Sequence, residues 1–184
     1  MSELDELREV QTASREIFDG RIMHVFEDTV RLPDGNAATR EYMRHIGAVC
    51  VIPVLENGDV LVERQYRYPV GQVLTEIPAG KLDRRDEDRL LAAQRELREE
   101  TGAEAGEWTS LGLFYPACAY SDEAIEMFLA RGIRFGERHL DKDEFLNVTR
   151  MPLTALLEAV MAGEVPDAKT QIAVLKAARL LGLH

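Results

Sequence analysis

The segment GKLDRRDEDRLLAAQRELREETGA, from Gly80 to Ala103, combines an apolar pattern with a dense run of charged side chains. Its second half predicts a helix from about Asp86 to Thr101, ended by Gly102, because glycine readily adopts the left-handed conformation of a helix C-cap. At about 100° per residue, one stripe of this helix is apolar and suited to face a core. The residues of that stripe are Leu90, Ala93, Leu97 and Thr101.

Three carboxylates, those of Glu96, Glu99 and Glu100, occupy the arc of the helix next to this stripe. Like charges one turn apart repel each other, and the repulsion grows at the edge of a core. A bound divalent cation removes that repulsion, and carboxylate oxygens suit magnesium or manganese. Arg95 lies four residues before Glu99 and can hold its carboxylate in place. A solvated helix face with several ion pairs is the alternative interpretation of the same residues.

The sequence before the helix, EIPAGKLD, favours a metal site, because Gly80 lets the backbone approach closely and a carbonyl oxygen can join the ligands. The whole segment resembles the Nudix box, G-x5-E-x7-R-E-U-x-E-E-x-G-U, where U is an apolar residue. The matching residues are Glu87, Arg95, Glu96, Leu97, Glu99, Glu100, Gly102 and Ala103. Gly80 lies one residue too far upstream, so either the loop holds an extra residue or Asp86 takes the role of the first glutamate. The spacing to Arg95 favours Glu87.

The resemblance implies the Nudix fold, an α+β architecture in which a mixed sheet is sandwiched between helices. It also implies an enzyme that hydrolyses a nucleoside diphosphate linked to another group, with Mg²⁺ or Mn²⁺ as cofactor. By their positions in the motif, Glu96 and Glu100 are the main expected metal ligands, together with the carbonyl oxygen of Ala79. Glu99 is expected to be a further ligand or to act in catalysis while Arg95 holds it.

The resemblance extends to the ADP-ribose pyrophosphatase branch of the family through VERQYRYPVG and EIPAGKLD, over roughly residues 18–182. It implies that Arg67 contacts the substrate phosphates, and that ADP-ribose is split into AMP and ribose 5-phosphate. That branch usually carries an S-P-G turn before S-D-E, whereas this chain reads FYPACAYSDE, with Cys118 at the proline position. Another nucleoside diphosphate sugar is therefore the alternative substrate. We do not expect Cys118 to be a catalytic thiol, because no histidine pattern accompanies it.

The resemblance also implies an acidic loop that carries the general base, and LDKDEFLNV is the matching stretch. Glu144 aligns best as the base, with Asp143 and Asp141 as alternatives. Solvated acids in a polar loop are the simpler interpretation of this stretch. The four histidines are scattered along the chain and predict no metal site of their own.

The chain divides into a small N-terminal β subdomain, residues 1–45, and a Nudix domain, residues 46–184. In the first, two strands within residues 22–43 flank the turn residues PDGN. In the second, GAVCVIPVL predicts a buried strand, and Asn57-Gly58 predicts a hairpin that returns along VLVERQYR. Helices are expected at about Thr154–Ala162 and after Asp167, the latter with Ile172, Leu175 and nearby alanines in its apolar stripe. Two or three strands are marginal alone, and the branch implies a swapped homodimer, about 41 kDa from chains of 20.7 kDa.

Composition and charge restrict the remaining functional classes. The chain has 184 residues, of which 46% are hydrophobic, and its net charge of −11 argues against a nucleic-acid or anionic membrane surface. No apolar run approaches a membrane span, and the two cysteines predict free thiols in the cytoplasm. An inactive Nudix-fold binding module and a plain metal-binding protein are the alternatives from other classes. The intact set of three glutamates argues against lost catalysis.

Overall fold

The computed structural model describes residues 6–138 and 145–183. The chain forms two compact units. The smaller unit comprises the chain up to His45 together with Ala117–Glu123, and the larger one comprises Ile46–Pro116 and the chain from Ala124 onward. Within the described residues, no helix is both long enough and apolar enough to span a bilayer.

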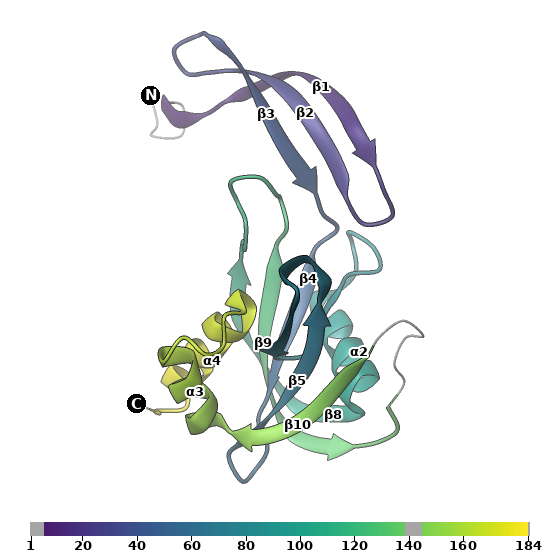
Figure 1. The fold of residues 1–184 in the computed structure, drawn as a ribbon, viewed down its shortest axis with the longest axis vertical. Coiled ribbons are helices and arrows are strands. Elements are labelled where there is room, and N and C mark those ends of the chain that lie inside the picture. Colours follow the sequence, from purple (N-terminus) through teal and green to yellow (C-terminus); the bar gives the residue numbers. More distant parts are fainter. Residues whose placement is uncertain (1–5, 139–144, 184) are drawn as a thin grey trace. The chain divides into compact units, whose positions relative to one another are not determined.

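The smaller unit contains a three-stranded antiparallel sheet of order β1-β2-β3 (Figure 1). Its strands are β1 (Val10–Asp19), β2 (His24–Arg31) and β3 (Ala37–Arg44). The expected turn joins β2 to β3, with Gly35 at φ 91° and the amide of Asn36 donating to Asp34 at 3.0 Å. β1 is not among the predicted strands. Its sequence, VQTASREIFD, shows no buried alternating face, and every residue of it is exposed.

The larger unit contains two sheets in its described part, of order β7-β4-β9-β8 and β10-β5-β6. β4 and β9 are parallel, and the other neighbouring strands are antiparallel. A short 3-10 helix, η1 (Tyr68–Val70), joins β5 to β6. The strands are β4 (Ala48–Pro53), β5 (Asp59–Arg67), β6 (Gln72–Glu76), β7 (Ala79–Lys81), β8 (Ala103–Phe114), β9 (Ile125–Phe135) and β10 (Leu146–Pro152).

Helices cover both faces of the sheet that contains β4 (Figure 1). Val49 and Val51 pack in one core cluster with residues of α2 (Arg89–Thr101). The intervening residues Cys50 and Ile52 pack in the other cluster, with residues of α3 (Leu153–Met161) and α4 (Ala168–Leu180). The side chains of β4 alternate between these clusters because successive strand residues point to opposite faces. This arrangement confirms the predicted α+β architecture of a mixed sheet between helices.

The predicted hairpin between β4 and β5 forms at its turn but does not continue along the two strands. Gly58 has φ 85°, and the side chain of Asn57 bonds to Asp59 as a turn residue should. Only the isolated bridge between Val54 and Val60 joins the two strands. β5 instead pairs with β6 and β10, because β4 already has β7 on one edge and β9 on the other.

The helix ends follow their capping residues. α2 begins at Arg89 rather than Asp86, because Asp88 is the N-cap and accepts a hydrogen bond from the amide of Leu91 at 3.0 Å. Gly102 ends it at φ 69°, as predicted. Asp167 caps α4 as expected, and of the predicted apolar stripe Ile172 packs against the core while Leu175 is 43% exposed. The buried residues of α4, which include the nearby alanines, are Thr170, Ala173, Val174, Ala177 and Ala178.

Candidate active site

Two of the three carboxylates expected beside the core lie on the buried side of α2. Glu96 and Glu100 are one turn apart and are 9% and 4% exposed, beside the fully buried Leu97. Glu99 lies at the margin, with 38% of its side chain exposed. Burying a carboxylate is unfavourable unless positive charge or hydrogen-bond donors compensate it. The surroundings of Glu96 and Glu100 therefore have to supply positive charge or hydrogen-bond donors.

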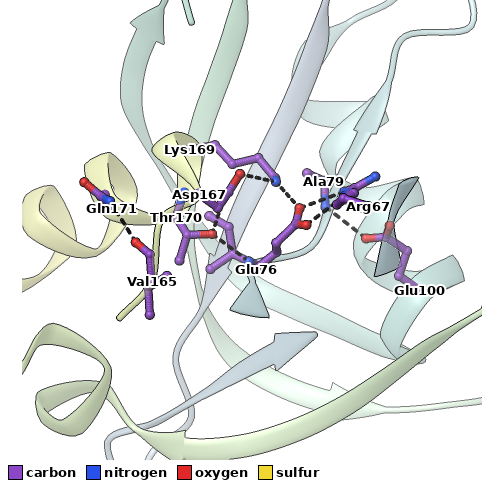
Figure 2. A network of polar contacts seen from close by, with 10 residues as sticks. Arg67, Glu76, Ala79, Glu100, Val165, Asp167, Lys169, Thr170 and Gln171 are labelled. Atoms are coloured by element: carbon purple, nitrogen blue, oxygen red, sulfur yellow. Dashed lines mark hydrogen bonds and ion pairs between the residues drawn. The ribbon is translucent and has the colours of Figure 1, made fainter. Parts of the chain in front are cut away.

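Strand β7 supplies a donor and the space for these carboxylates. The amide of Ala79 donates a hydrogen bond of 2.9 Å to Oε2 of Glu100 (Figure 2). At the next residue, Gly80, a side chain would collide with Glu96. A Cβ placed there would lie 1.9 Å from Cδ of Glu96 and 2.1 and 2.2 Å from its two carboxylate oxygens. Glycine is required at this position by the contact with Glu96, since Gly80 does not have a positive φ.

Arg95 joins the acids of α2 to the loop before the helix. Its Nη1 donates to Oε1 of Glu96 at 2.7 Å and to Oε2 of Glu99 at 3.3 Å. Its Nη2 donates to the carbonyl oxygen of Lys81 at 3.3 Å. Burial opposes the charged form of Arg95, but the attraction of Glu96 and neighbouring acids outweighs it and raises the pKa of Arg95. The guanidinium stays charged and compensates part of the negative charge of the cluster.

The same loop distinguishes between the two candidates for the first glutamate of the motif. Oε1 of Glu87 lies 3.5 Å from Nη2 of Arg95, and its Oε2 accepts a hydrogen bond of 2.6 Å from the amide of Asp83. The side chain of Asp86 is 87% exposed and pairs with Arg84 instead. Glu87 therefore takes the structural position next to Arg95, and the loop holds the extra residue.

A second charged group is formed by residues near the ends of β5, β6 and α4 (Figure 2). Arg67 donates through Nε to Oε1 of Glu76 and through Nη2 to Oε2, both at 2.7 Å. The carboxylate of Glu76, only 2% exposed, also accepts a hydrogen bond from Nζ of Lys169. Burial raises the pKa of Glu76, but the bonds from Arg67 and the charge of Lys169 outweigh it, so the pKa lies below its ordinary value.

Sequence reasoning missed Glu76 and Lys169 as members of this group. The signal for Glu76 is a glutamate that begins the stretch EIPAGKLD, four residues before the motif glycine Gly80. Lys169 stands two residues after the N-cap of α4, where Nζ also donates to Oδ1 of Asp167 at 2.9 Å. Nothing local in the sequence connects Lys169 with Glu76.

The described residues contain one group of three His, Cys, Asp or Glu side chains whose possible ligand atoms all lie within 4.8 Å of one another. This group, Glu16, Asp19 and His24, belongs to the smaller unit, although the sequence predicted no grouping around a histidine. Nδ1 of His24 lies 2.7 Å from Oδ1 of Asp19. The acids of α2 are not gathered as closely, and the contacts of Arg95 and Ala79 hold them in place. Glu144, Asp143 and Asp141 lie outside the described residues.

A cavity of about 370 Å³ lies between α2 and β8. Its lining residues are Leu91, Gln94, Arg95, Arg98, Glu104, Ala105 and Trp108. Arg95 is shared with the acidic cluster, whereas Glu96, Glu100 and Arg67 do not line this cavity. The cavity therefore adjoins the acidic cluster only through Arg95, and Arg67 is not part of its lining.

The arrangement offers two kinds of chemistry. The buried carboxylates of Glu96 and Glu100 and the backbone of β7 provide hard oxygen atoms, which magnesium and manganese prefer. Arg67 provides a guanidinium, whose planar fork matches the oxygens of a phosphate. Charge on Glu100 contributes to raising the pKa of Arg67, after the larger effect of its hydrogen bond with Glu76. The guanidinium is thus within electrostatic reach of the carboxylates on α2.

Comparison with known proteins agrees with this geometry. The family model described as NUDIX domain matches residues 43–172, and that of a nucleoside diphosphate sugar hydrolase N-terminal domain matches residues 10–43. An ADP-ribose pyrophosphatase of Bacillus subtilis is 38% identical, with 93% of each chain covered. A methanol dehydrogenase activator of Bacillus methanolicus is 37% identical, over 95% of this chain and 94% of its own. A crystal structure of an ADP compounds hydrolase shares the fold, with a TM-score of 0.83 at 20% identity over 95% of both chains.

Proposed function

This chain belongs to the Nudix family, and from that premise we propose that its substrate is ADP-ribose, which water splits into AMP and ribose 5-phosphate. The chain is a pyrophosphohydrolase of that family. We propose that, among the nucleoside diphosphate sugars, it prefers ADP-ribose. Support for ADP-ribose comes from the similarity to the Bacillus subtilis enzyme along nearly the whole of both chains.

The observation that carries the proposal is the pair of buried carboxylates on α2, held against β7. Glu96 fills the space left by the missing side chain of Gly80, and Glu100 is fixed by the amide of Ala79. Such a set of oxygen donors fits Mg²⁺ or Mn²⁺, which Glu96, Glu100 and the carbonyl oxygen of Ala79 would hold, with Glu99 as a further ligand. When bound, the cation supplies positive charge for the phosphate oxygens and lowers the pKa of water.

Three other residues have proposed roles in this reaction. Arg67 binds the phosphates of the substrate through its guanidinium. Arg95 orients the carboxylates of Glu96 and Glu99, because it bonds to both. Glu144 is the proposed general base, which removes a proton from the attacking water.

The test is release of AMP from ADP-ribose in the presence of Mg²⁺, followed by removal of the cation with a chelator. Glu96→Gln and Glu100→Gln should each lower kcat by orders of magnitude while the fold survives. Glu107→Gln is the matched control, because that side chain is 64% exposed and pairs only with Arg131 within the described residues. Near-normal activity of Glu96→Gln or Glu100→Gln would contradict the assignment of that residue as a metal ligand.

A substrate panel decides between ADP-ribose and the alternative substrates. If GDP-mannose or another sugar diphosphonucleoside gives the higher kcat/KM, the chain is a Nudix hydrolase of different preference. Absence of turnover on every compound, with binding retained, would favour the inactive binding module. Preference for nucleoside triphosphates would contradict the proposal altogether.

The base assignment has its own test. Glu144→Gln should lower kcat by about 10²–10⁴-fold and leave metal affinity unchanged, since a general base acts on the reaction rather than on binding. Asp143→Asn is the neighbouring control. Loss of kcat in Asp143→Asn alone would transfer the role to Asp143.

We also propose that the protein is a homodimer and that it is located in the cytoplasm. We expect a homodimer through the smaller unit, whose exposed apolar side chains include Ile17, Phe18, Ile22 and Met23. Light scattering should give twice the chain mass of 20.7 kDa, and a monomer at micromolar concentration would contradict it. The free thiols of Cys50 and Cys118 are consistent with a cytoplasmic location.

A further inference from the structure

We propose that Glu76 is a positioning residue for Arg67, and that Lys169 fixes Glu76 from the side of α4. Glu76 itself does not contact the substrate in this proposal. Its carboxylate holds the guanidinium that binds the phosphates. The inference deepens the proposed function of the site and rests on it.

Glu76 fixes the geometry of the guanidinium of Arg67. Two parallel hydrogen bonds of 2.7 Å join its Nε and Nη2 to the two oxygens of Glu76. Such a fork fixes both the position and the plane of the group. Nη1 donates no hydrogen bond within the described residues, and 42% of the Arg67 side chain is exposed. One edge of the guanidinium is therefore held by Glu76, and Nη1, on the other edge, has its donors left for an anion.

Glu76 is itself held in place by residues at the beginning of α4. Its carboxylate is buried and accepts a bond from Lys169, whose side chain is 12% exposed and also bonds to Asp167 (Figure 2). The hydroxyl of Thr170 accepts a bond of 3.0 Å from the amide of Ile77, the residue after Glu76. The beginning of α4 is thus attached both to the side chain of Glu76 and to the backbone beside it.

The charges of the group balance. Arg67 and Lys169 carry two positive charges, and Glu76 and Asp167 carry two negative ones. Arg67 has no second acid bonded to it within the described residues. An anion that binds to Arg67 meets a guanidinium that its two bonds to Glu76 already orient, which lowers the entropy lost on binding.

A double-mutant cycle tests whether Glu76 acts through Arg67. The variants are Glu76→Gln, Arg67→Ala and the double variant, with ADP-ribose binding measured by calorimetry in the presence of a chelator. Each single variant should bind about 10-fold or more weakly, as expected for a lost charged hydrogen bond. The double variant should bind no more weakly than Arg67→Ala, because Glu76 has no guanidinium left to position. Additive losses would overturn the inference.

A control separates positioning from a merely structural link between β6 and α4. Thr170→Val removes the hydroxyl that accepts a bond from the amide of Ile77 and donates one to Oδ2 of Asp167, and it leaves the pair of Arg67 and Glu76 intact. It should lower the free energy of unfolding without weakening ADP-ribose binding. If Thr170→Val weakens binding as much as Glu76→Gln does, the group only holds the helix, and the inference is wrong.

The cycle also distinguishes this inference from the proposed function. If the wild type binds ADP-ribose but does not hydrolyse it, the proposed function fails and the binding cycle still decides the role of Glu76. If the wild type does not bind ADP-ribose, the same cycle is run with inorganic pyrophosphate as the probe. Non-additive losses then support the inference, and additive losses or absence of pyrophosphate binding overturn it.

Discussion

Gly80 shows how a missing side chain determines where a charged group lies. The carboxylate of Glu96 occupies the place that a Cβ of residue 80 would take. Because the colliding atoms are at the far end of a flexible side chain, a larger residue would displace Glu96 rather than unfold the strand. We therefore expect a substitution of Gly80 to change the position of the Glu96 carboxylate more than the stability of β7.

We predict that Gly80→Ala loses affinity for Mn²⁺ and lowers kcat by at least an order of magnitude. The free energy of unfolding should change by only about 1 kcal/mol, because the side chain of Glu96 can rotate away. Gly106→Ala is the control, since a Cβ there would lie 3.8 Å from the carbonyl oxygen of Gly132, an ordinary contact. Calorimetric titration with Mn²⁺ and urea unfolding provide the two measurements. Unchanged Mn²⁺ affinity would show that Glu96 is not a ligand.

The two thiols should differ in reactivity. Burial raises the pKa of Cys50 to about 12, whereas Cys118 is exposed. Since the thiolate is the nucleophile, Cys50 is protected both by its protonation and by its burial. A thiol reagent at pH 8 should therefore titrate one thiol in the native protein and two after denaturation. Cys118→Ser should abolish the native reaction, and a remaining fast thiol in that variant would contradict the burial of Cys50.

At the scale of the element, Asp167 has two functions at the beginning of α4. It caps the helix, and it pairs with Lys169. Oδ2 of Asp167 accepts a hydrogen bond of 2.9 Å from the amide of Thr170, which caps the helix. Oδ1 of the same side chain pairs with Lys169. The cap needs only a hydrogen-bond acceptor, whereas the pair with Lys169 needs the negative charge.

Asp167→Ala should lower the free energy of unfolding by about 1–2 kcal/mol, because the bonds from Lys169 and from the amide and hydroxyl of Thr170 all disappear. Asp167→Asn should lose less, since the amide oxygen still caps the helix while the charge is gone. Urea unfolding of the two variants, with the wild type as reference, measures the difference. Equal losses in both would mean that the charge, and not the cap, stabilises α4.

The sequence predicts the elements whose signals are local. The apolar run of β4, the stripe and C-cap of α2 and the N-cap of α4 all lie within a few residues of the features that mark them. β1 has no such signal, because none of its residues is buried. The partner of β5 could not be predicted from the turn before it, since the choice depends on strands that already occupy both edges of β4.

The same distinction holds for the site. Glu96, Glu100 and Gly80 belong to one motif, so their spacing on α2 and before it is enough to bring them together. Glu76 and Lys169 are 93 residues apart, and their contact depends on where α4 packs against the sheet. Such a contact follows from the tertiary structure, which the sequence pattern does not specify.

At the scale of the whole molecule, Glu76 couples stability to pH because it joins β5, β6 and α4. Its pKa is lowered from an ordinary value of 4.5, so the folded state favours its ionised form. The stability that it contributes is present above that ordinary pKa and is lost as the pH falls through the lowered pKa. The free energy of unfolding of Glu76→Gln should be below that of the wild type at pH 7, and the gap should close on acidification below about pH 4.5.

Urea unfolding of both proteins from pH 7 downward provides the measurement. At low pH the protonated glutamate and the glutamine are nearly equivalent, which is why the two curves should meet. A gap that stays constant over the whole range would mean that the ionisation of Glu76 does not stabilise the fold.

Strand β4 has a consequence for how the chain reaches this structure. All six of its residues are buried, and its parallel partner β9 begins only at Ile125. Before β9 pairs with β4 during folding, the collapsed chain exposes an apolar strand whose backbone groups are unpaired. Strands of other copies can pair with it. Pairing across such a distance along the chain is slow. Refolding from urea should therefore give a smaller fraction of native protein as the protein concentration rises. The rest should aggregate through the segment AVCVIP of β4.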